Sequence, residues 1–236
     1  MLVTPFFQSV NGLLSFTREQ GSEFAKEIAN DFNPIHDVDA KRFCIPGDLL
    51  FSVLLSQVGI CRELDVNFAG MVTDQTRLKI VAECARKSSL VDESDKQYLN
   101  IEHSNDGLTD PKLIDQLTAA YVAFSGESFP HILVPLMAEH QVMINPDRPM
   151  VMYTDMKIRF DDLSFSSLAL RMTGSELEVL GKRGNVSLNF EFVDGDRVVG
   201  HGEKHMVLSG LRAYEQASID GLVAAHSERK NRLVAA

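Results

Sequence analysis

The sequence predicts an α+β fold made of two similar halves. A helix, a polar loop, an apolar core helix and antiparallel strands follow one another twice along the 236 residues, which suits two halves packed together. Residues 71–80 (MVTDQTRLKI) resemble residues 151–160 (VMYTDMKIRF), and each segment follows an apolar helix. We therefore predict a first half over residues 1–108, a second half over residues 109–210 and a terminal helix over residues 211–236.

The composition is that of a globular protein and excludes several classes of partner. Apolar residues make up 44% of the chain and charged residues 24%, close to globular averages. The formal net charge of −10 and the pI of about 5.1 argue against a surface that binds nucleic acid. The N-terminus lacks the basic region of a signal peptide, and no apolar run reaches the length of a membrane span. We expect a cytoplasmic protein with no nucleic-acid or membrane partner.

The three cysteines, Cys44, Cys61 and Cys84, do not have the paired spacing of a zinc site or of a disulfide framework. We predict that they are reduced thiols with a structural role.

In the first half, Thr17 and Gln20 have the spacing of a capping box, and the apolar residues that follow recur on one face, which predicts a helix over residues 17–30. After the sequence Pro-Gly-Asp at positions 46–48, the apolar run over residues 49–60 predicts a buried core helix. Strands are predicted by alternating apolar residues between polar stretches. Their ranges are 66–73, 77–82 and 97–103.

In the second half, the sequence Thr-Asp-Pro at positions 109–111 predicts a helix start, and helices are expected over residues 112–124 and 133–143. Four strands follow by the same alternation, and Asp194-Gly195 is a strong hairpin signal. The strand ranges are 150–160, 167–173, 186–193 and 197–208. The charged segment over residues 211–234 is predicted to be a helix without a chemical role.

The segment from Asp31 to His36 carries the clearest functional signal. It reads Asp-Phe-Asn-Pro-Ile-His, follows a predicted helix, and precedes an acidic residue and Ala40. This pattern resembles the hydratase motif of the MaoC-like and R-specific enoyl-CoA hydratases. The resemblance covers residues 24–40 and the core helix that follows.

This resemblance implies a hot-dog fold, in which a curved antiparallel sheet wraps around a central helix. Together with the two halves predicted above, it favours a double hot-dog, and a single hot-dog with a long insertion near residues 65–128 stays open as the alternative. The implied ligand is an acyl thioester of coenzyme A or of acyl carrier protein, which is the substrate, and no metal or redox cofactor is implied. A homodimer is a further partner that the resemblance allows.

The resemblance also assigns roles to individual residues. Asp31 would activate a water as general base, and His36 would hold and share that water, so that it adds syn across a 2-enoyl thioester. Asn33 would orient the loop. Gly47 matches the position whose backbone N–H holds the thioester oxygen at the start of the core helix. Asp48 departs from the His-Gly-Met type of sequence found in the family and places a carboxylate near developing negative charge.

Three functions stay open at this point. The first is an enoyl-thioester hydratase, acting as a 3-hydroxyacyl-thioester dehydratase in reverse. The second is a hot-dog thioesterase in which Asp48 is the base or the nucleophile. The third is a non-catalytic acyl-binding or regulatory module. Asp, Asn and Pro are also common turn residues, so the same segment can simply end a helix.

Three other segments are weaker candidates. Ser125 to His131 faintly resembles the motif in the second half, and we interpret it as a degenerate, non-catalytic site or as an ordinary helix start. His201, Glu203 and His205 share one strand face, which we predict to be solvated rather than to bind a metal. Lys182 or Arg183, at a hairpin end, could meet a phosphate of coenzyme A.

Overall fold

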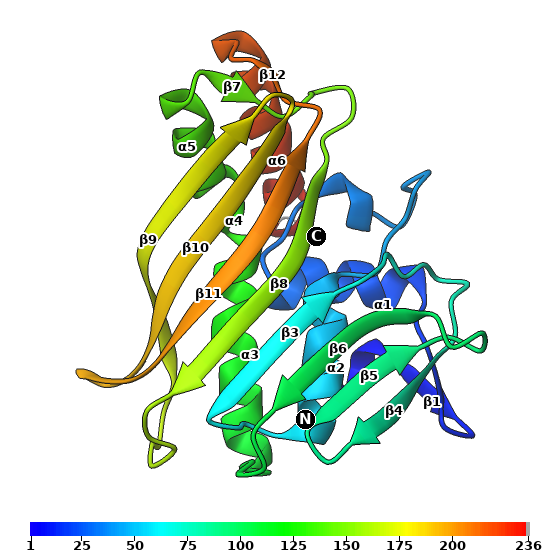
Figure 1. Ribbon diagram of the computed structural model, residues 1–236. Coiled ribbons are helices and arrows are strands. Elements are labelled where there is room, and N and C mark those ends of the chain that lie inside the picture. Colours follow the sequence, from blue (N-terminus) through cyan, green and yellow to red (C-terminus); the bar gives the residue numbers. More distant parts are fainter. Residues whose placement is uncertain (235–236) are drawn as a thin grey trace.

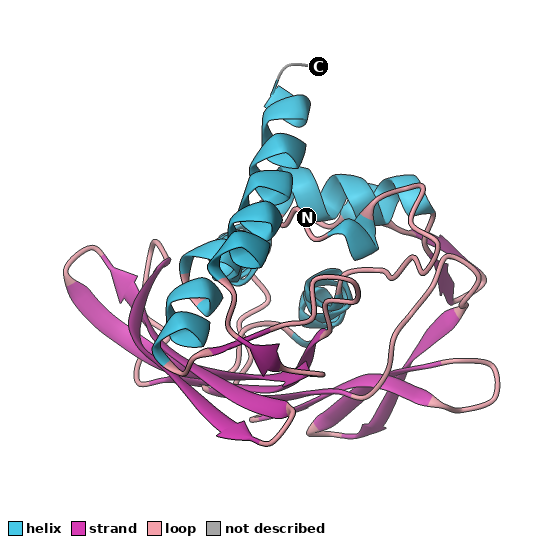
Figure 2. Cartoon of the chain, turned by 90° about the horizontal axis from the view of Figure 1, so that it is seen from above, coloured by secondary structure: helices cyan, strands magenta, loops and turns pink. Residues whose placement is uncertain are grey.

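The computed structural model describes residues 1–234 and consists of one strongly curved antiparallel sheet with helices on its concave side (Figures 1 and 2). The sheet has ten strands in the order β1-β2-β4-β5-β6-β3-β8-β11-β10-β9. The strands are β1 (Gln8–Val10), β2 (Leu13–Ser15), β3 (Glu63–Phe68), β4 (Leu78–Cys84), β5 (Lys87–Val91), β6 (Gln97–His103), β8 (Val151–Phe160), β9 (Ala169–Leu180), β10 (Arg183–Asp194) and β11 (Arg197–Ser209). A separate pair is formed by β7 (Val142–Met143) and β12 (Arg212–Ala213).

The strand order repeats in the two halves. In each half, the strand that follows the helices pairs with the last strand of a three-strand meander: β3 pairs with β6, and β8 pairs with β11. The two halves join through the antiparallel pair β3 and β8, in which Leu64 lies opposite Ile158 and Val66 lies opposite Met156, all four buried. Two curved half-sheets that cradle helices and meet edge to edge make a double hot-dog, as the sequence predicted.

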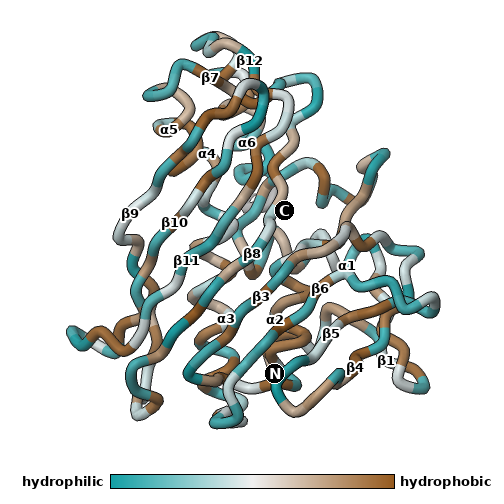
Figure 3. Tube along the Cα trace, viewed as in Figure 1, coloured by the Kyte–Doolittle hydropathy of each residue, from teal (hydrophilic) through white to brown (hydrophobic). Residues whose placement is uncertain are grey.

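The helices fill the concave face of the sheet. They are η1 (Thr4–Phe6), α1 (Arg18–Glu23), the π-helix η2 (Phe24–Ile28), the 3-10 turn η3 (Pro34–His36), α2 (Gly47–Val58), α3 (Pro111–Gly126), α4 (Ser128–His131), α5 (Leu133–Glu139) and α6 (Gln216–Val234). The central helix α2 packs against β5 and β6, and α3 packs against α2 and β9. Helix α2 is mostly coloured as apolar in Figure 3, and every residue from Asp48 to Leu55 is buried, the polar Asp48 and Ser52 included.

Local sequence signals explain where several elements begin and end. The capping box at Thr17 is present, with its hydroxyl accepting from the Gln20 N–H at 3.1 Å. Helix α2 ends at Gly59, which has a φ of +83° and lies so close to Leu108 that a Cβ would be 2.6 Å from its carbonyl oxygen. In β10, alternate residues from Val186 to Phe192 face the core.

Several predicted boundaries were wrong. The helix predicted over residues 17–30 is interrupted, because α1 gives way to the π-helix η2. The strand predicted over residues 66–73 ends at Phe68, and the helix predicted over residues 133–143 ends at Glu139 because β7 pairs with β12. The terminal helix begins at Gln216 rather than at residue 211, and residues 235–236 of the predicted range lie outside the described residues. The strand predicted over residues 167–173 extends to Leu180 as β9. Five short strands were not predicted: β1, β2, β5, β7 and β12.

The predicted correspondence between residues 71–80 and residues 151–160 was wrong. Residues 151–160 form β8, whose counterpart in the first half is β3, whereas residues 71–77 lie in a loop and lead into β4. The strand order does repeat in the two halves. The similar segments 71–80 and 151–160 are not equivalent positions in that repeat.

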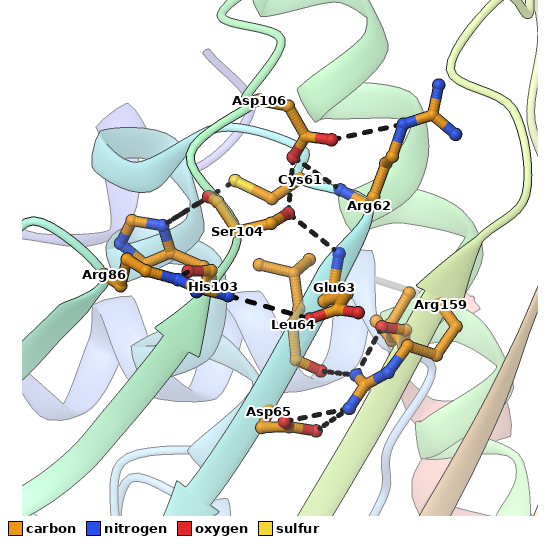
Figure 4. Close-up of polar contacts among 11 residues, drawn as sticks. Cys61, Arg62, Glu63, Leu64, Asp65, Arg86, His103, Ser104, Asp106 and Arg159 are labelled. Carbon is orange, nitrogen blue, oxygen red and sulfur yellow. Dashed lines mark hydrogen bonds and ion pairs between the residues drawn. The ribbon is translucent and has the colours of Figure 1, made fainter.

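Polar contacts stabilise the junction of the two halves at the beginning of β3 (Figure 4). Arg159 of β8 holds both carboxylate oxygens of Asp65 at 2.6 and 2.8 Å and donates to the carbonyl oxygen of Leu64 at 3.2 Å. Arg62 pairs with Asp106 at 3.2 Å on the opposite side of the strand. These contacts tie β3 to β8 and to the segment after β6, and they pin the register of the central strand pair.

None of the helices in the described part of the chain is long and apolar enough to cross a membrane. Among the described residues, no group of three or more His, Cys, Asp and Glu side chains is arranged to hold a metal ion. His201 pairs with Asp161 at 3.3 Å, while His205 bonds Asp155 at 2.7 Å and Glu203 at 2.9 Å. Cys44, Cys61 and Cys84 are free thiols.

Candidate functional site

The motif loop begins where the first helix unwinds. Asn30 has a φ of +54°, and the Asp31 N–H returns to the carbonyl oxygen of Ala25 at 2.7 Å, which turns the chain out of the π-helix. The Asn33 side chain then caps the turn η3 by accepting from the Ile35 N–H at 3.2 Å, with Pro34 at its first position. These contacts place Asp31 and His36 at the two ends of a short, rigid segment.

Asp31 and His36 face each other. The Nε2 atom of His36 lies 3.6 Å from Oδ2 of Asp31, and the side chains retain only 10% and 19% of their exposure, respectively. The other ring nitrogen of His36, Nδ1, lies 2.6 Å from the carbonyl oxygen of Cys44. Because a carbonyl oxygen only accepts, Nδ1 carries the proton, and the lone pair of a neutral His36 points from Nε2 towards Asp31.

The environment of Asp31 raises the pKa of its carboxyl group. Burial raises the pKa of the Asp31 carboxyl above its usual value, and the nearby Asp48 carboxylate adds to that effect, whereas His36 and the Asn33 N–H oppose it. Asp31 Oδ1 accepts from that Asn33 N–H at 2.9 Å. A carboxylate with a raised pKa is a better base near neutral pH than a solvated aspartate.

The two side chains line a cavity of about 300 Å³, which we call the dyad cavity. Its walls include Asp31, His36, Gly47, Asp48, Phe68 and Tyr153. Gly47 is the first residue of α2, and no acceptor among the described residues pairs with its N–H. A Cβ at Gly47 would lie 3.3 Å from the Phe68 ring and 3.5 Å from Tyr153, so glycine keeps this part of the cavity open.

Asp48 is not an isolated charge beside Gly47. Its Oδ1 accepts from the Tyr121 hydroxyl at 2.9 Å, its Oδ2 accepts from the Ser125 hydroxyl, and the Lys204 ammonium lies 3.5 Å from Oδ1. We call Asp48, Tyr121, Ser125, Tyr153 and Lys204 the polar cluster. It joins α2 of the first half to α3, β8 and β11.

Lys204 is the unexpected member of the polar cluster, because it is fully buried. Its ammonium donates to Ser125 and lies 3.4 Å from the centre of the Tyr153 ring. Burial lowers the pKa of Lys204, and Asp48 opposes that shift. Burial likewise raises the pKa of both tyrosines well above the usual value, so their hydroxyls stay protonated. Paired as carboxylate and ammonium, Asp48 and Lys204 leave the cluster without net charge.

A second cavity, of about 350 Å³, lies on the other side of Asp31. Asp31 and Tyr153 line both cavities, so both spaces border Asp31 of the dyad. The second cavity is covered by Leu222, Ala225, His226 and Arg229 of α6, and we call it the α6 cavity.

The residues predicted for the site lie together, whereas most of the weaker candidates lie elsewhere. The structure brings together the five residues predicted for the site, Asp31, Asn33, His36, Gly47 and Asp48, around the dyad cavity. Ser125, from the weak second motif, belongs to the polar cluster, whereas the His131 side chain is exposed. Lys182 and Arg183 line separate surface hollows that do not include the dyad.

The sequence prediction missed Lys204, Tyr121 and Tyr153. One signal was available for Lys204. In β11 the apolar residues Met206 and Leu208 face the core, and with period two Lys204 shares their face, opposite to His201 and His205. A charged residue in register with buried apolar neighbours indicates a buried polar partner.

Comparisons with known proteins identify a family and several solved structures of low sequence identity. The profile of the family described as "Protein of unknown function (DUF3581)" matches residues 1–217. No curated protein matches the chain.

Among solved structures, the tesB protein of Mycobacterium avium subs paratuberculosis is 10% identical, covers 88% of this chain and 97% of its own, and has a TM-score of 0.47. A putative MaoC domain protein dehydratase from Chloroflexus aurantiacus is 10% identical, with coverages of 86% and 94% and a TM-score of 0.45. A hot-dog protein of unknown function from Alicyclobacillus acidocaldarius is 9% identical, with coverages of 86% and 95% and a TM-score of 0.45. The fold assignment rests on the strand order and on the helices that the curved sheet cradles.

Proposed function

The chain belongs to the DUF3581 family, and we propose that it is an enoyl-thioester hydratase, which in reverse dehydrates 3-hydroxyacyl thioesters of coenzyme A or acyl carrier protein. The observation that carries this proposal is the facing pair of Asp31 and His36, with Nε2 and Oδ2 3.6 Å apart at the wall of a cavity. A water can lie about 2.8 Å from both atoms at that separation, held by a base on each side.

The reaction adds the elements of one water across the double bond. Asp31, as carboxylate, takes a proton from the water while the water oxygen bonds to C3 of the enoyl thioester, and His36 Nε2 holds the second water proton as acceptor. The electrons of the double bond shift towards the thioester carbonyl. The proton on Asp31 then passes to C2 from the same face, which gives syn addition and returns Asp31 to its starting state.

The thioester oxygen needs a donor while it carries the negative charge. The N–H of Gly47, at the positive end of α2, has no acceptor within residues 1–234 and can make that contact. Asp48 follows directly, but Tyr121, Ser125 and Lys204 compensate its charge. A bare carboxylate would oppose the developing enolate strongly, whereas a paired and hydrogen-bonded one costs much less. With the polar cluster around it, Asp48 is compatible with hydration, although the MaoC-like hydratases carry a different residue at this position.

The same contacts argue against Asp48 as base or nucleophile of a thioesterase. Both of its carboxylate oxygens already hold donors, and attack on a thioester requires a free oxygen that points into the cavity. Asp31 has one donor, on Oδ1, and its Oδ2 faces His36. Hydration at Asp31 is the function that the geometry supports better.

The test is hydration of crotonyl-CoA and longer 2-enoyl-CoA substrates, followed by the loss of the conjugated enoyl absorbance. We expect turnover by the wild type and a loss of about 10²-fold to 10⁴-fold in kcat for Asp31→Asn and for His36→Gln. Asp39→Asn, an exposed carboxylate of the same loop, should keep the wild-type rate.

Three results would decide against hydration. Release of free thiol from acyl-CoA would indicate a thioesterase. Binding without turnover of any thioester would indicate an acyl-binding module. Equal rates for Asp31→Asn and Asp39→Asn would remove Asp31 from the mechanism.

A further inference from the structure

Two polar groups in the wall of the α6 cavity have no partner in the fold. Within residues 1–234, three buried side-chain nitrogen and oxygen atoms lack a hydrogen-bond partner. Two of the three, Ser128 Oγ and His226 Nε2, belong to residues that line this cavity. Leaving a buried polar atom unpaired costs free energy, so two such atoms around one cavity point to a ligand that supplies the bonds.

Ser128 and His226 come from different elements that meet at the cavity. Ser128 is the first residue of α4 and is only 5% exposed. The His226 ring of α6 packs edge-to-face on Phe129, the residue after Ser128, and on Phe32 of the motif loop, with both centroid distances at 5.6 Å. These aromatic contacts fix the ring, and they keep it close to Ser128.

The surroundings of His226 are positively charged. Burial lowers the pKa of His226, and the nearby His131, Lys230 and Arg229 lower it further, so the ring is neutral near neutral pH. A neutral ring can carry its proton on Nε2 and donate from there. The same positive surroundings favour a bound anion beside the ring.

Arg229 brings a cation to the same wall of the cavity. It follows His226 by three residues in α6, so the two side chains share one face of the helix. Its Nε lies 3.4 Å from Asp37, which also pairs with Lys26 at 2.9 Å, and the group of two cations and one carboxylate keeps a net positive charge. Within residues 1–234 the two terminal nitrogens of Arg229 have no acceptor, and their geometry suits a carboxylate.

Two carboxylates also border the cavity, and each has a basic partner elsewhere. Asp31 faces His36 at 3.6 Å, and Asp147 lies 3.4 Å from Arg212. The Asp147 side chain is 81% exposed, so solvent and salt screen its charge. These two residues weaken the attraction of Arg229 for an anion without cancelling it.

We propose that the α6 cavity binds a small organic acid, whose carboxylate accepts from Arg229, His226 Nε2 and Ser128 Oγ. The apolar body of the acid lies against aliphatic side chains in the same lining: Leu133, Ile144, Val151, Met206 and Leu222. A water-sized group occupies about 30 Å³ in a liquid, so a space of about 350 Å³ takes an acid of roughly ten non-hydrogen atoms. This site is separate from the dyad cavity, and the proposal does not depend on hydration at Asp31.

Binding of two acids of that size to the full chain tests the proposal. Octanoate and 3-phenylpropanoate are each compared by calorimetry with the alcohol of the same skeleton, which keeps the apolar body and lacks the charge. We expect at least one acid to bind about tenfold or more tightly than its alcohol. Binding of octanoate alone would assign the site to straight-chain acids, and binding of 3-phenylpropanoate alone would assign it to aromatic acids.

Matched variants locate the carboxylate. Arg229→Gln should weaken acid binding about tenfold or more, whereas Arg232→Gln, at an exposed arginine of the same helix, should leave the affinity unchanged.

Ser128→Ala keeps the test valid if Arg229→Gln loosens α6. It should weaken acid binding by about threefold to tenfold. The free variant should nevertheless unfold at the same urea concentration as the wild type or at a higher one, because the substitution removes an unpaired buried hydroxyl.

Gly47→Ala distinguishes the two cavities. Gly47 lines only the dyad cavity, where an added methyl group enters the space, so this variant should bind the acid as the wild type does. Weaker binding in Gly47→Ala than in Ser128→Ala would place the acid in the dyad cavity and overturn the proposal.

Three further results would also overturn it. These are no binding of either acid, equal affinities for acid and alcohol, or wild-type affinity in both Arg229→Gln and Ser128→Ala. None of these measurements uses an enoyl thioester, so their failure leaves the hydration proposal standing, and a failure of hydration leaves the acid site standing.

Discussion

Lys204 Nζ lies 3.5 Å from Asp48 Oδ1 in the interior, and neither side chain has appreciable contact with solvent. Asp48 comes from the first half, at the start of α2, and Lys204 from the second half, in β11. The pair therefore links the two halves at the wall of the dyad cavity. Burying a charge costs free energy unless the charge is paired, so Asp48 and Lys204 each offset the cost of burying the other.

Removal of Lys204 should destabilise the protein strongly. Lys204→Met leaves Asp48 buried with two neutral donors, and we expect a loss of about 3–5 kcal/mol in the free energy of unfolding, measured in urea. Adding Asp48→Asn to Lys204→Met should recover part of that loss, because no uncompensated charge remains. A double-mutant cycle in which the two changes simply add would contradict the pairing.

The difference in stability between Asp31→Asn and the wild type should depend on pH. Burial raises the pKa of Asp31 in the folded protein above its unfolded value. The contribution of this carboxyl to stability is therefore fully present below the unfolded pKa of about 4 and is lost as pH rises through the folded pKa. Asparagine does not titrate, so the variant should gain stability relative to the wild type between about pH 3.5 and pH 7.

Urea unfolding of Asp31→Asn, Asp39→Asn and the wild type at both pH values tests this expectation. Asp39 is exposed, and its variant should follow the wild type at both values. The same stability difference between Asp31→Asn and the wild type at both pH values would mean that the Asp31 pKa is not raised in the fold.

Glycine at position 126 should be indispensable for packing. An added Cβ would lie 1.8 Å from the carbonyl oxygen of Ala29, where α3 meets the end of η2. Gly126→Ala must push α3 away from the motif loop, and we expect a loss of about 3 kcal/mol or more. Gly221→Ala in α6 has open space and should stabilise the protein by about 0.5–1 kcal/mol. Similar thermal shifts for both variants would contradict the close contact.

Gly47 should matter more for activity than for stability. Its Cβ would lie 3.3 Å from the Phe68 ring, a contact that a small movement relieves, yet the added methyl group enters the dyad cavity. For Gly47→Ala we expect a rate loss of roughly tenfold to a hundredfold, with a change of less than about 1 kcal/mol in stability. A wild-type rate would show that the thioester does not bind at this helix end.

The motif loop and the central helix were predictable because their signals are local. The capping box, the Asn-Pro turn and the apolar run after Gly47 act within a few residues, so the sequence places Asp31, His36 and Gly47 on adjacent elements. The strand boundaries were less accurate, since pairing partners decide where a strand ends. Residues 66–73 lose their partner after Phe68, for example.

The polar cluster and the α6 cavity were not predictable in the same way. Lys204 is 156 residues from Asp48 along the chain, and only the wrapping of β11 over α2 and α3 brings the two together. The charged helix α6 carries no local sign of where it docks, and its contacts with Phe32 and Asp37 arise from the tertiary fold.

The most direct test of the central claim is the fate of the oxygen atom from water. Wild-type protein incubated with crotonyl-CoA in heavy-oxygen water should yield 3-hydroxybutyryl-CoA with one heavy oxygen in its hydroxyl group and the thioester intact, as read by mass spectrometry. Asp31→Asn should yield almost none. Heavy oxygen in the carboxylate of a released free acid, or labelled hydroxyacyl-CoA at equal rates from wild type and Asp31→Asn, would contradict the account.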